Sequence, residues 1–209
     1  MAGYAVKEMF LTIQGEGMQA GRRAVFIRFA GCNLWSGREA DRATAICRFC
    51  DTEFVGTDGD GGGRYDADGL ADQALALWDG DGAPFAVLTG GEPMLQIDAS
   101  LIAALKARGF TIAVESNGTI AAAPGIDWLC ISPKAGSKVV QQSGDEVKVV
   151  WPQSTLDMDA IAQWDFAHRL VQPMDGPDLT TNEAAAIAFV LAHPGWRLSV
   201  QMHKLMGLR

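Results

Sequence analysis

The sequence lacks the features that mark secreted, membrane-spanning and nucleic-acid-binding proteins. Four cysteines in 209 residues are too few for a disulfide framework. No apolar run approaches the roughly 18 residues that span a bilayer, and the first residues lack the basic and apolar regions of a secretory signal. A net charge of −8 argues against non-specific binding to nucleic acid. We therefore expect a cytoplasmic protein with reduced cysteines, no membrane segment and no nucleic-acid partner.

What the chain does contain is an alternation of short apolar runs with helical patterns. Strands are predicted at residues 24–30, 85–89, 110–115, 127–132, 146–151, 169–172 and 197–202, and helices at 67–78, 98–108, 154–163 and 181–193. This alternation predicts an α/β fold with a parallel sheet. Because 209 residues are few for eight βα units, we expect an open, incomplete βα barrel forming a single domain, residues 1–209. The glycine-rich segment 56–69 predicts a mobile surface loop.

Polar or glycine residues follow nearly every predicted strand. They are Gly31-Cys32, Gly90-Gly91-Glu92-Pro93, Glu115-Ser116-Asn117-Gly118, Ser132-Pro133-Lys134 and Gln172-Pro173-Met174-Asp175. In parallel α/β folds ligands bind at the carboxyl ends of the strands. The sequence therefore predicts a binding site at this edge of the sheet.

Three of the four cysteines lie within residues 31–54, which we call the cluster loop. Cys32, Cys47 and Cys50 follow a C-x14-C-x2-C spacing, and three thiolates in one loop indicate a soft-metal site. A structural zinc site would take a fourth ligand, and His168, His193 and His203 lie far away in the sequence. Cys130, within the apolar run DWLCIS, is predicted to be a small buried side chain. Three thiolates fit an iron–sulfur cluster with one open iron, and a remnant zinc site is the alternative.

The ordered set of motifs resembles the radical S-adenosylmethionine (SAM) superfamily and, within it, the 7-carboxy-7-deazaguanine synthase family. The motifs are TIQGEG (12–17), FIRFAGCNLW (26–35), CDT (50–52), TGGEP (89–93), ESNG (115–118) and SPK (132–134), with a looser match at VQPMDG (171–176). One position departs from the superfamily. Its C-x3-C-x2-C spacing would place a cysteine where Ser36 stands, and Cys47 comes eleven residues later. We expect Cys47 to take this role and the inserted residues to bulge outward.

The resemblance implies how the cofactors are held. Cys32, Cys47 and Cys50 would bind a 4Fe-4S cluster, and Thr52 would bind Mg²⁺ with substrate oxygens and waters completing the shell. SAM would contact Phe49, Gly91, Glu92, Ser132, Pro133, Lys134, Gln172 and Asp175. Simpler interpretations remain for several of these: loop packing for Phe49, a tight turn for Gly90-Gly91, and a solvated loop start for residues 132–134.

The resemblance also implies a pterin substrate, 6-carboxy-5,6,7,8-tetrahydropterin. Its contacts would be Ile13, Gln14, Gly15, Glu16, Arg28, Thr89 and Arg209. Arg28 lies in an otherwise apolar run, so it pairs either with a protein carboxylate or with that of the substrate, which we favour. No catalytic residue is assigned beyond Glu115 as a candidate.

The implied activity is that of a radical SAM ring-contracting lyase. A reduced cluster would cleave SAM to a 5′-deoxyadenosyl radical that takes a hydrogen from C6 of the pterin, and loss of ammonia would give 7-carboxy-7-deazaguanine on the queuosine pathway. The protein would orient the reactants and exclude water. An external reductant such as flavodoxin and a homodimer are expected. The alternatives are a glycyl-radical-enzyme activase, which needs a protein substrate, and a zinc-stabilised binding module.

Overall fold

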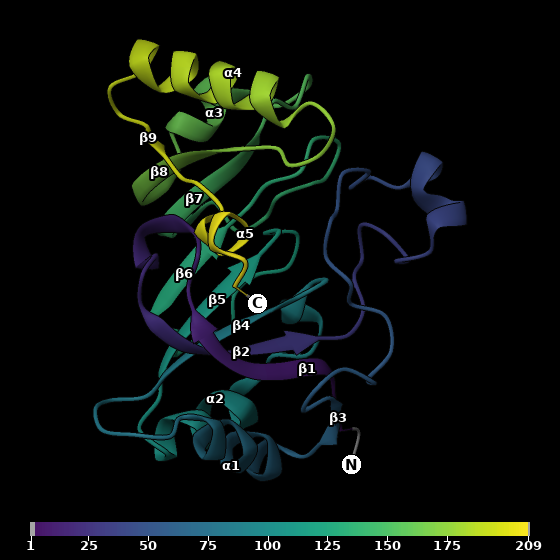
Figure 1. The fold of residues 1–209 in the computed structure, drawn as a ribbon, viewed down its shortest axis with the longest axis vertical. Coiled ribbons are helices and arrows are strands. Elements are labelled where there is room, and N and C mark those ends of the chain that lie inside the picture. Colours follow the sequence, from purple (N-terminus) through teal and green to yellow (C-terminus); the bar gives the residue numbers. More distant parts are fainter. Residues whose placement is uncertain (1–2, 209) are drawn as a thin grey trace.

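A computed structural model of the chain describes residues 3–208. Within them, nine strands form one sheet in the order β3-β1-β2-β4-β5-β6-β7-β8-β9. The strands are β1 (Tyr4–Ile13), β2 (Arg23–Phe29), β3 (Gly63–Tyr65), β4 (Phe85–Gly90), β5 (Thr111–Ser116), β6 (Trp128–Ile131), β7 (Ser143–Trp151), β8 (Asp165–Pro173) and β9 (Arg197–Leu198). Figure 1 shows the sheet as a curved wall with helices at both ends and the C-terminal segment in front of it.

Seven strands that are neighbours in the sheet run parallel: β2, β4, β5, β6, β7, β8 and β9. Strand β1 is antiparallel to both β2 and β3. The predicted open α/β barrel is confirmed. Strand β1 is not among the predicted strands, because the charged Lys7 and Glu8 separate its buried residues Val6 and Met9. Residues 14–16 follow β1 at the amino end of β2, and from there they contact side chains of β5 and β7, as Gln14 does with Glu115 and Glu16 with Lys148.

Helices cover the sheet where the chain crosses from one strand to the next. They are α1 (Ala67–Leu77), α2 (Ala99–Ala107), α3 (Met158–Ala162), α4 (Leu179–Ala192) and α5 (Met202–Met206), with 3₁₀ turns η1 (Gly17–Gln19), η2 (Glu39–Thr44) and η3 (Pro93–Leu95). Aspartates 66, 98 and 157 accept backbone N–H bonds at the starts of α1, α2 and α3. Gly109 follows α2 with φ +82°, the left-handed conformation expected after a helix end.

Strand alternation separates the packed core from the site. Val147 and Val149 of β7 are fully buried in the hydrophobic core, whereas Glu146 and Lys148 point to the opposite face. On that face Glu115, Cys130 and Glu146 are register partners on β5, β6 and β7. A row of ionisable side chains therefore crosses the centre of the sheet.

Four predictions of secondary structure need correction. Within the expected loop 56–69, residues 63–65 form β3 because their backbone pairs with β1. The predicted strand 197–202 is shortened to β9, and the predicted helix 154–163 to α3. Helix α5 is absent from the predictions, because its five residues are too few to show a helical period. Among residues 3–208, no helix combines the length and apolar character needed to cross a membrane.

Candidate active site

Two adjoining pockets open at the carboxyl ends of the parallel strands. One, the cysteine pocket, is lined by Cys32, Cys47, Cys50, Gly91, Ser132, Lys134, Lys148, Gln172 and Asp175 among others. The other, the arginine pocket, is lined by Ile13, Gln14, Gly15, Arg28 and His203 among others. Six residues line both pockets: Glu16, Asp51, Thr52, Thr89, Glu115 and Gln201. The predicted site edge therefore contains two connected binding spaces.

The cluster loop returns to its starting point after an outward excursion. The amides of Ile46 and Cys47 both donate to the carbonyl of Leu34, at 3.1 and 3.3 Å. Between Leu34 and Ile46 the turn η2 projects from the body of the molecule (Figure 1). Ser36 lies within the excursion, where its hydroxyl is exposed and donates to Asp41 at 2.6 Å. This closure places Cys47 beside Leu34 in spite of the long spacing, which agrees with the predicted bulge.

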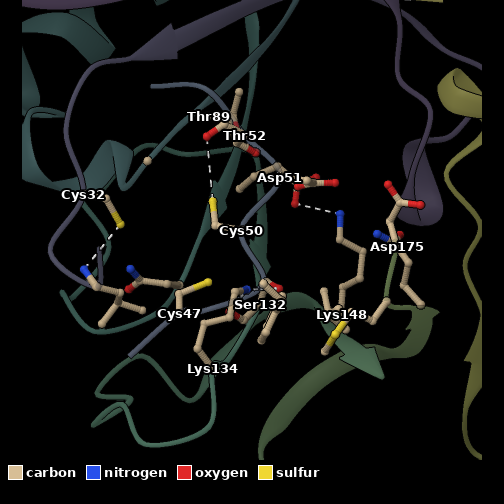
Figure 2. Close-up of a pocket in the computed structure, with 18 of the residues that line it drawn as sticks. Cys32, Cys47, Cys50, Asp51, Thr52, Thr89, Ser132, Lys134, Lys148 and Asp175 are labelled. Atoms are coloured by element: carbon tan, nitrogen blue, oxygen red, sulfur yellow. Dashed lines mark hydrogen bonds and ion pairs between the residues drawn. The ribbon is translucent and has the colours of Figure 1, made fainter. Parts of the chain in front are cut away.

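All three cysteines of the cluster loop face the cysteine pocket (Figure 2). Cys47 is buried, and Cys32 and Cys50 are half-buried. A hydrogen bond from Cys47 lowers the pKa of the Cys50 thiol to about 6, although burial opposes the shift. That same hydrogen bond, followed by burial, raises the pKa of Cys47, and burial raises the pKa of Cys32. Cys130 is fully buried on β6, outside the lining of this pocket.

The corner formed by β4 and β5 closes the pocket beside Cys32. Glu92 is fully buried there, and its carboxylate accepts hydrogen bonds from the amides of Met94 (2.9 Å) and Asn117 (2.7 Å) and from the Ser116 hydroxyl (2.8 Å). A side chain on Gly91 would collide with the carbonyl of Gly31 and the Cβ of Cys32. Gly91 therefore lets the cluster loop pack against this corner, and Glu92 fixes its shape. Glu92 does not face the pocket, so the expected contact with the SAM ammonium has no support in this geometry.

Most of the other predicted SAM contacts meet in the cysteine pocket. Ser132 accepts from the half-buried Lys134 ammonium at 2.6 Å, and burial lowers the pKa of that lysine. Gln172 is buried, and Asp175 is paired with Lys204 at 2.6 Å. Phe49 also lines the pocket, whereas the Pro133 carbonyl is turned to Gln153.

Arg28 reaches the arginine pocket from β2 but is already paired with the protein. Its Nε donates to Glu8 at 2.8 Å, and the two side chains are 20% and 18% exposed. The alternative partner, a protein carboxylate, is therefore present at Nε. No residue within 3–208 accepts from its Nη groups, so binding of a substrate carboxylate there stays a prediction. The predicted contact Arg209 lies outside the described residues.

The boundary between the pockets is a buried ion-pair network. The Lys148 ammonium lies 2.7 Å from Glu16 and 2.9 Å from Glu115, with the lysine side chain 5% exposed. Burial would raise the pKa of Glu16, but the Lys148 charge and three hydrogen bonds outweigh it and lower the pKa to about 2. Glu16 is accordingly an ionised acceptor on the shared wall.

Comparisons with known proteins identify the family. No family model matches the chain. It is 58% identical to the 7-carboxy-7-deazaguanine synthase of Caulobacter vibrioides over 207 residues, 98% of this chain and 99% of the relative. The synthase of Bordetella pertussis is 55% identical over 98% of this chain and 99% of its own length. The chain belongs to the 7-carboxy-7-deazaguanine synthase family. A crystal structure of QueE from Escherichia coli shares the fold, with a TM-score of 0.71 over 96% of this chain and 95% of that one, at 24% identity.

The residues present fit the 4Fe-4S cluster and SAM that a 7-carboxy-7-deazaguanine synthase uses. Three thiols face one pocket while the fourth cysteine lies apart, which matches a cluster with one open iron. The fit to Mg²⁺ is thinner, because the carboxylate next to Thr52, that of Asp51, is ion-paired with Lys204. A metal at Thr52 would need substrate oxygens and waters, as the sequence predicted.

Several residues that line the two pockets are absent from the sequence predictions. Lys148, in the apolar run EVKVVW, carried the same signal as Arg28, a charge inside a buried strand. Gln201 and His203 carried no signal, because only tertiary packing brings them to the site. The amide of Met202 donates to the Gly15 carbonyl at 3.0 Å, and this contact places α5 over residues 14–16.

Proposed function

We propose that this protein converts 6-carboxy-5,6,7,8-tetrahydropterin to 7-carboxy-7-deazaguanine with loss of ammonia, as a radical SAM lyase of 7-deazapurine biosynthesis. Family membership carries the assignment, at up to 58% identity over almost the whole chain. It decides against both alternatives, the glycyl-radical-enzyme activase and the zinc-stabilised module. The two connected pockets suit a reaction in which a cofactor and a small substrate lie side by side.

The chain's part in this chemistry is to hold the reactants and exclude water. When bound, the cluster and SAM supply the radical that takes a hydrogen from the pterin. Cys32, Cys47 and Cys50 would hold the cluster. Ser132, Lys134, Gln172 and Asp175 would contact SAM, while Gly91, Phe49 and Pro133 would shape its pocket.

Substrate would occupy the arginine pocket. Gln14 and Glu16 offer an amide and a carboxylate to the pterin edge, with Ile13, Gly15 and Thr89 beside them. The Arg28 Nη groups would bind the substrate carboxylate, and Thr52 would contribute to Mg²⁺. Glu115, on the wall common to both pockets, is the remaining candidate for a contact with the substrate.

Product formation tests the function directly. Protein reconstituted anaerobically with iron and sulfide should turn brown and, with SAM, reductant and the carboxylated tetrahydropterin, should release ammonia and 7-carboxy-7-deazaguanine. Mass spectrometry of the product is the measurement. A cluster-replete protein that binds SAM but yields no deazapurine would contradict the assignment.

We also propose partners that follow from this chemistry. The cluster must be reduced before it can cleave SAM, so an external reductant such as flavodoxin is expected, and a cytoplasmic location would keep the four free cysteines reduced. A homodimer is supported by exposed Leu191 on α4 and Leu205 and Met206 on α5, which are 79%, 73% and 63% exposed. Light scattering on the purified protein measures the oligomeric state.

A further inference from the structure

Lys148 is a buried cation without a role in the proposed chemistry. Its side chain on β7 is 5% exposed, and its ammonium bridges the carboxylates of Glu16 and Glu115 at 2.7 and 2.9 Å. The two carboxylates come from separate parts of the fold, since Glu16 follows β1 and Glu115 ends β5. One ammonium therefore fixes two acidic side chains with respect to each other.

The carboxylates have further partners that fix their orientation. The second oxygen of Glu16 accepts from Gln201 at 2.8 Å, and that of Glu115 accepts from Gln14 at 3.3 Å. Both acids line both pockets, whereas Lys148 lines the cysteine pocket alone. A ligand in the arginine pocket would therefore contact Glu16 and Glu115 but not Lys148.

The charges around Lys148 explain its ionisation. The groups that face it are Glu16 after β1, Glu115 on β5, Cys130 on β6, Lys134 after β6 and Glu146 on its own strand. Burial would lower the pKa of Lys148, but Glu115 and Glu16 outweigh it and raise that pKa. Burial, and then the charge of Glu115, raises the pKa of Glu146. Glu146 lines neither of the two pockets, and it also accepts from the Met18 amide at 2.8 Å.

We propose that Lys148 is a positioning residue that keeps Glu16 and Glu115 as a pair of ionised hydrogen-bond acceptors for the aminopyrimidine edge of the pterin. The inference rests on the substrate site proposed above. The 2-amino and N3 groups of that ring are N–H donors, and carboxylates are their strongest protein acceptors. Without the ammonium between them, the two half-buried carboxylates repel each other and one takes up a proton. A protonated carboxyl then presents a hydrogen where the ring needs an acceptor.

Lys148→Met tests the proposal, with pterin and SAM binding measured by calorimetry on cluster-replete protein. We expect SAM affinity close to that of wild type and pterin affinity lower by roughly tenfold or more at neutral pH. Because the raised carboxyl pKa favours the protonated form at low pH, pterin affinity of the variant relative to wild type should recover as pH rises from about 6 to about 9. Arg108→Met is the matched control, since Arg108 also bridges two carboxylates, Asp68 and Asp72, but on the surface of α1 and α2.

The outcomes separate a positioning role from a structural one. Pterin affinity that is unchanged, or lost without recovery at high pH, or lost together with SAM affinity, overturns the proposal. If the methionine variant does not fold, Lys148→Gln replaces it, because glutamine keeps a donor but lacks the charge. In the wild type, pterin binding should release no proton from the protein, and proton release measured in buffers of different ionisation enthalpy overturns the proposal without any variant. Failure of wild-type protein to bind pterin at all would instead refute the proposed substrate site.

Discussion

The cysteine pocket and the arginine pocket satisfy their polar groups in different ways. In the arginine pocket and on its shared wall the charges are already paired within the protein, as Arg28 is with Glu8 and Lys148 with Glu16 and Glu115. In the cysteine pocket the thiols have weak contacts, such as the 3.4 Å bond from the Leu34 amide to the Cys32 sulfur and the 3.9 Å contact of Cys50 with the Thr52 carbonyl.

This contrast separates the part of the site whose shape is fixed by contacts within the protein from the part that presents ligand atoms for a cofactor. Paired charges in a partly buried wall hold a fixed shape and select a ligand by its own pattern of donors and acceptors. The thiols are ligand atoms carried on a loop whose ends are fastened by the Leu34 carbonyl and by packing of Trp35 against Phe54, with ring centroids 5.6 Å apart. Changes in the cysteine pocket should therefore alter cofactor content, and changes in the arginine pocket should alter substrate affinity.

The largest effect is expected at Cys47. Cys47→Ala should abolish cluster loading, since it removes one of the three thiols that face the pocket. Ser36→Ala, the matched control, should load iron as wild type does, because Ser36 bonds Asp41 within the excursion. Iron analysis of reconstituted protein is the measurement. Loss of iron in the Ser36 variant with retention in the Cys47 variant would exchange the two assignments.

Arg28→Lys should separate substrate binding from cofactor binding. An ammonium cannot reproduce a two-point contact with a carboxylate, so pterin affinity should fall by about tenfold to a hundredfold, or roughly 1.5–3 kcal/mol, with SAM affinity retained. Calorimetry in the presence of SAM measures both. Arg23→Lys, at the other end of β2 and stacked over Trp78 at 4.5 Å, is the control that should bind pterin normally. If the Arg28 variant and wild type bind pterin equally well, Arg28 does not bind the substrate and serves only to pair with Glu8.

Glu92 tests whether the corner of β4 and β5 beside Cys32 is a structural element. The Glu92 carboxylate accepts hydrogen bonds from the amides of Met94 and Asn117. In Glu92→Gln the side-chain NH₂ would face one of these N–H donors, so the free energy of unfolding should fall by about 1–3 kcal/mol. For a chain of this size the midpoint of thermal unfolding should drop by roughly 2–4 °C per kcal/mol. Glu183→Gln, exposed on α4, is the control with no expected change. A Glu92 variant that melts with wild type but fails to bind SAM would restore the predicted contact with the SAM ammonium.

The sequence predicted the parallel strands and the three thiols because both depend on local pattern. Apolar runs such as FAVLT become buried strands in almost any α/β context. The partner of a charged residue depends on tertiary placement, so the sequence marks Arg28 as a charge in an apolar strand but does not predict Glu8, its neighbour across β1 and β2, as its partner. Glu92 was expected to face the cofactor, and its burial follows from the position of Asn117 on the next strand end. The same signal, a charged residue within an apolar strand, also marks Lys148 in the run EVKVVW.

The smallest effect is expected at Cys130, which lies behind both pockets. It is fully buried on β6, in register with Glu115 on one side and Glu146 on the other. Burial raises the pKa of its thiol well above the ordinary value, so this sulfur stays protonated, unlike a metal-bound thiolate. Cys130→Ala should keep full iron content and turnover, and the small cavity left by the sulfur should cost about 1 kcal/mol of stability. Iron analysis and thermal unfolding, run beside Cys47→Ala, measure the two effects. An iron content lower by about a quarter would make Cys130 a fourth ligand, and the cluster would then have no open iron for SAM.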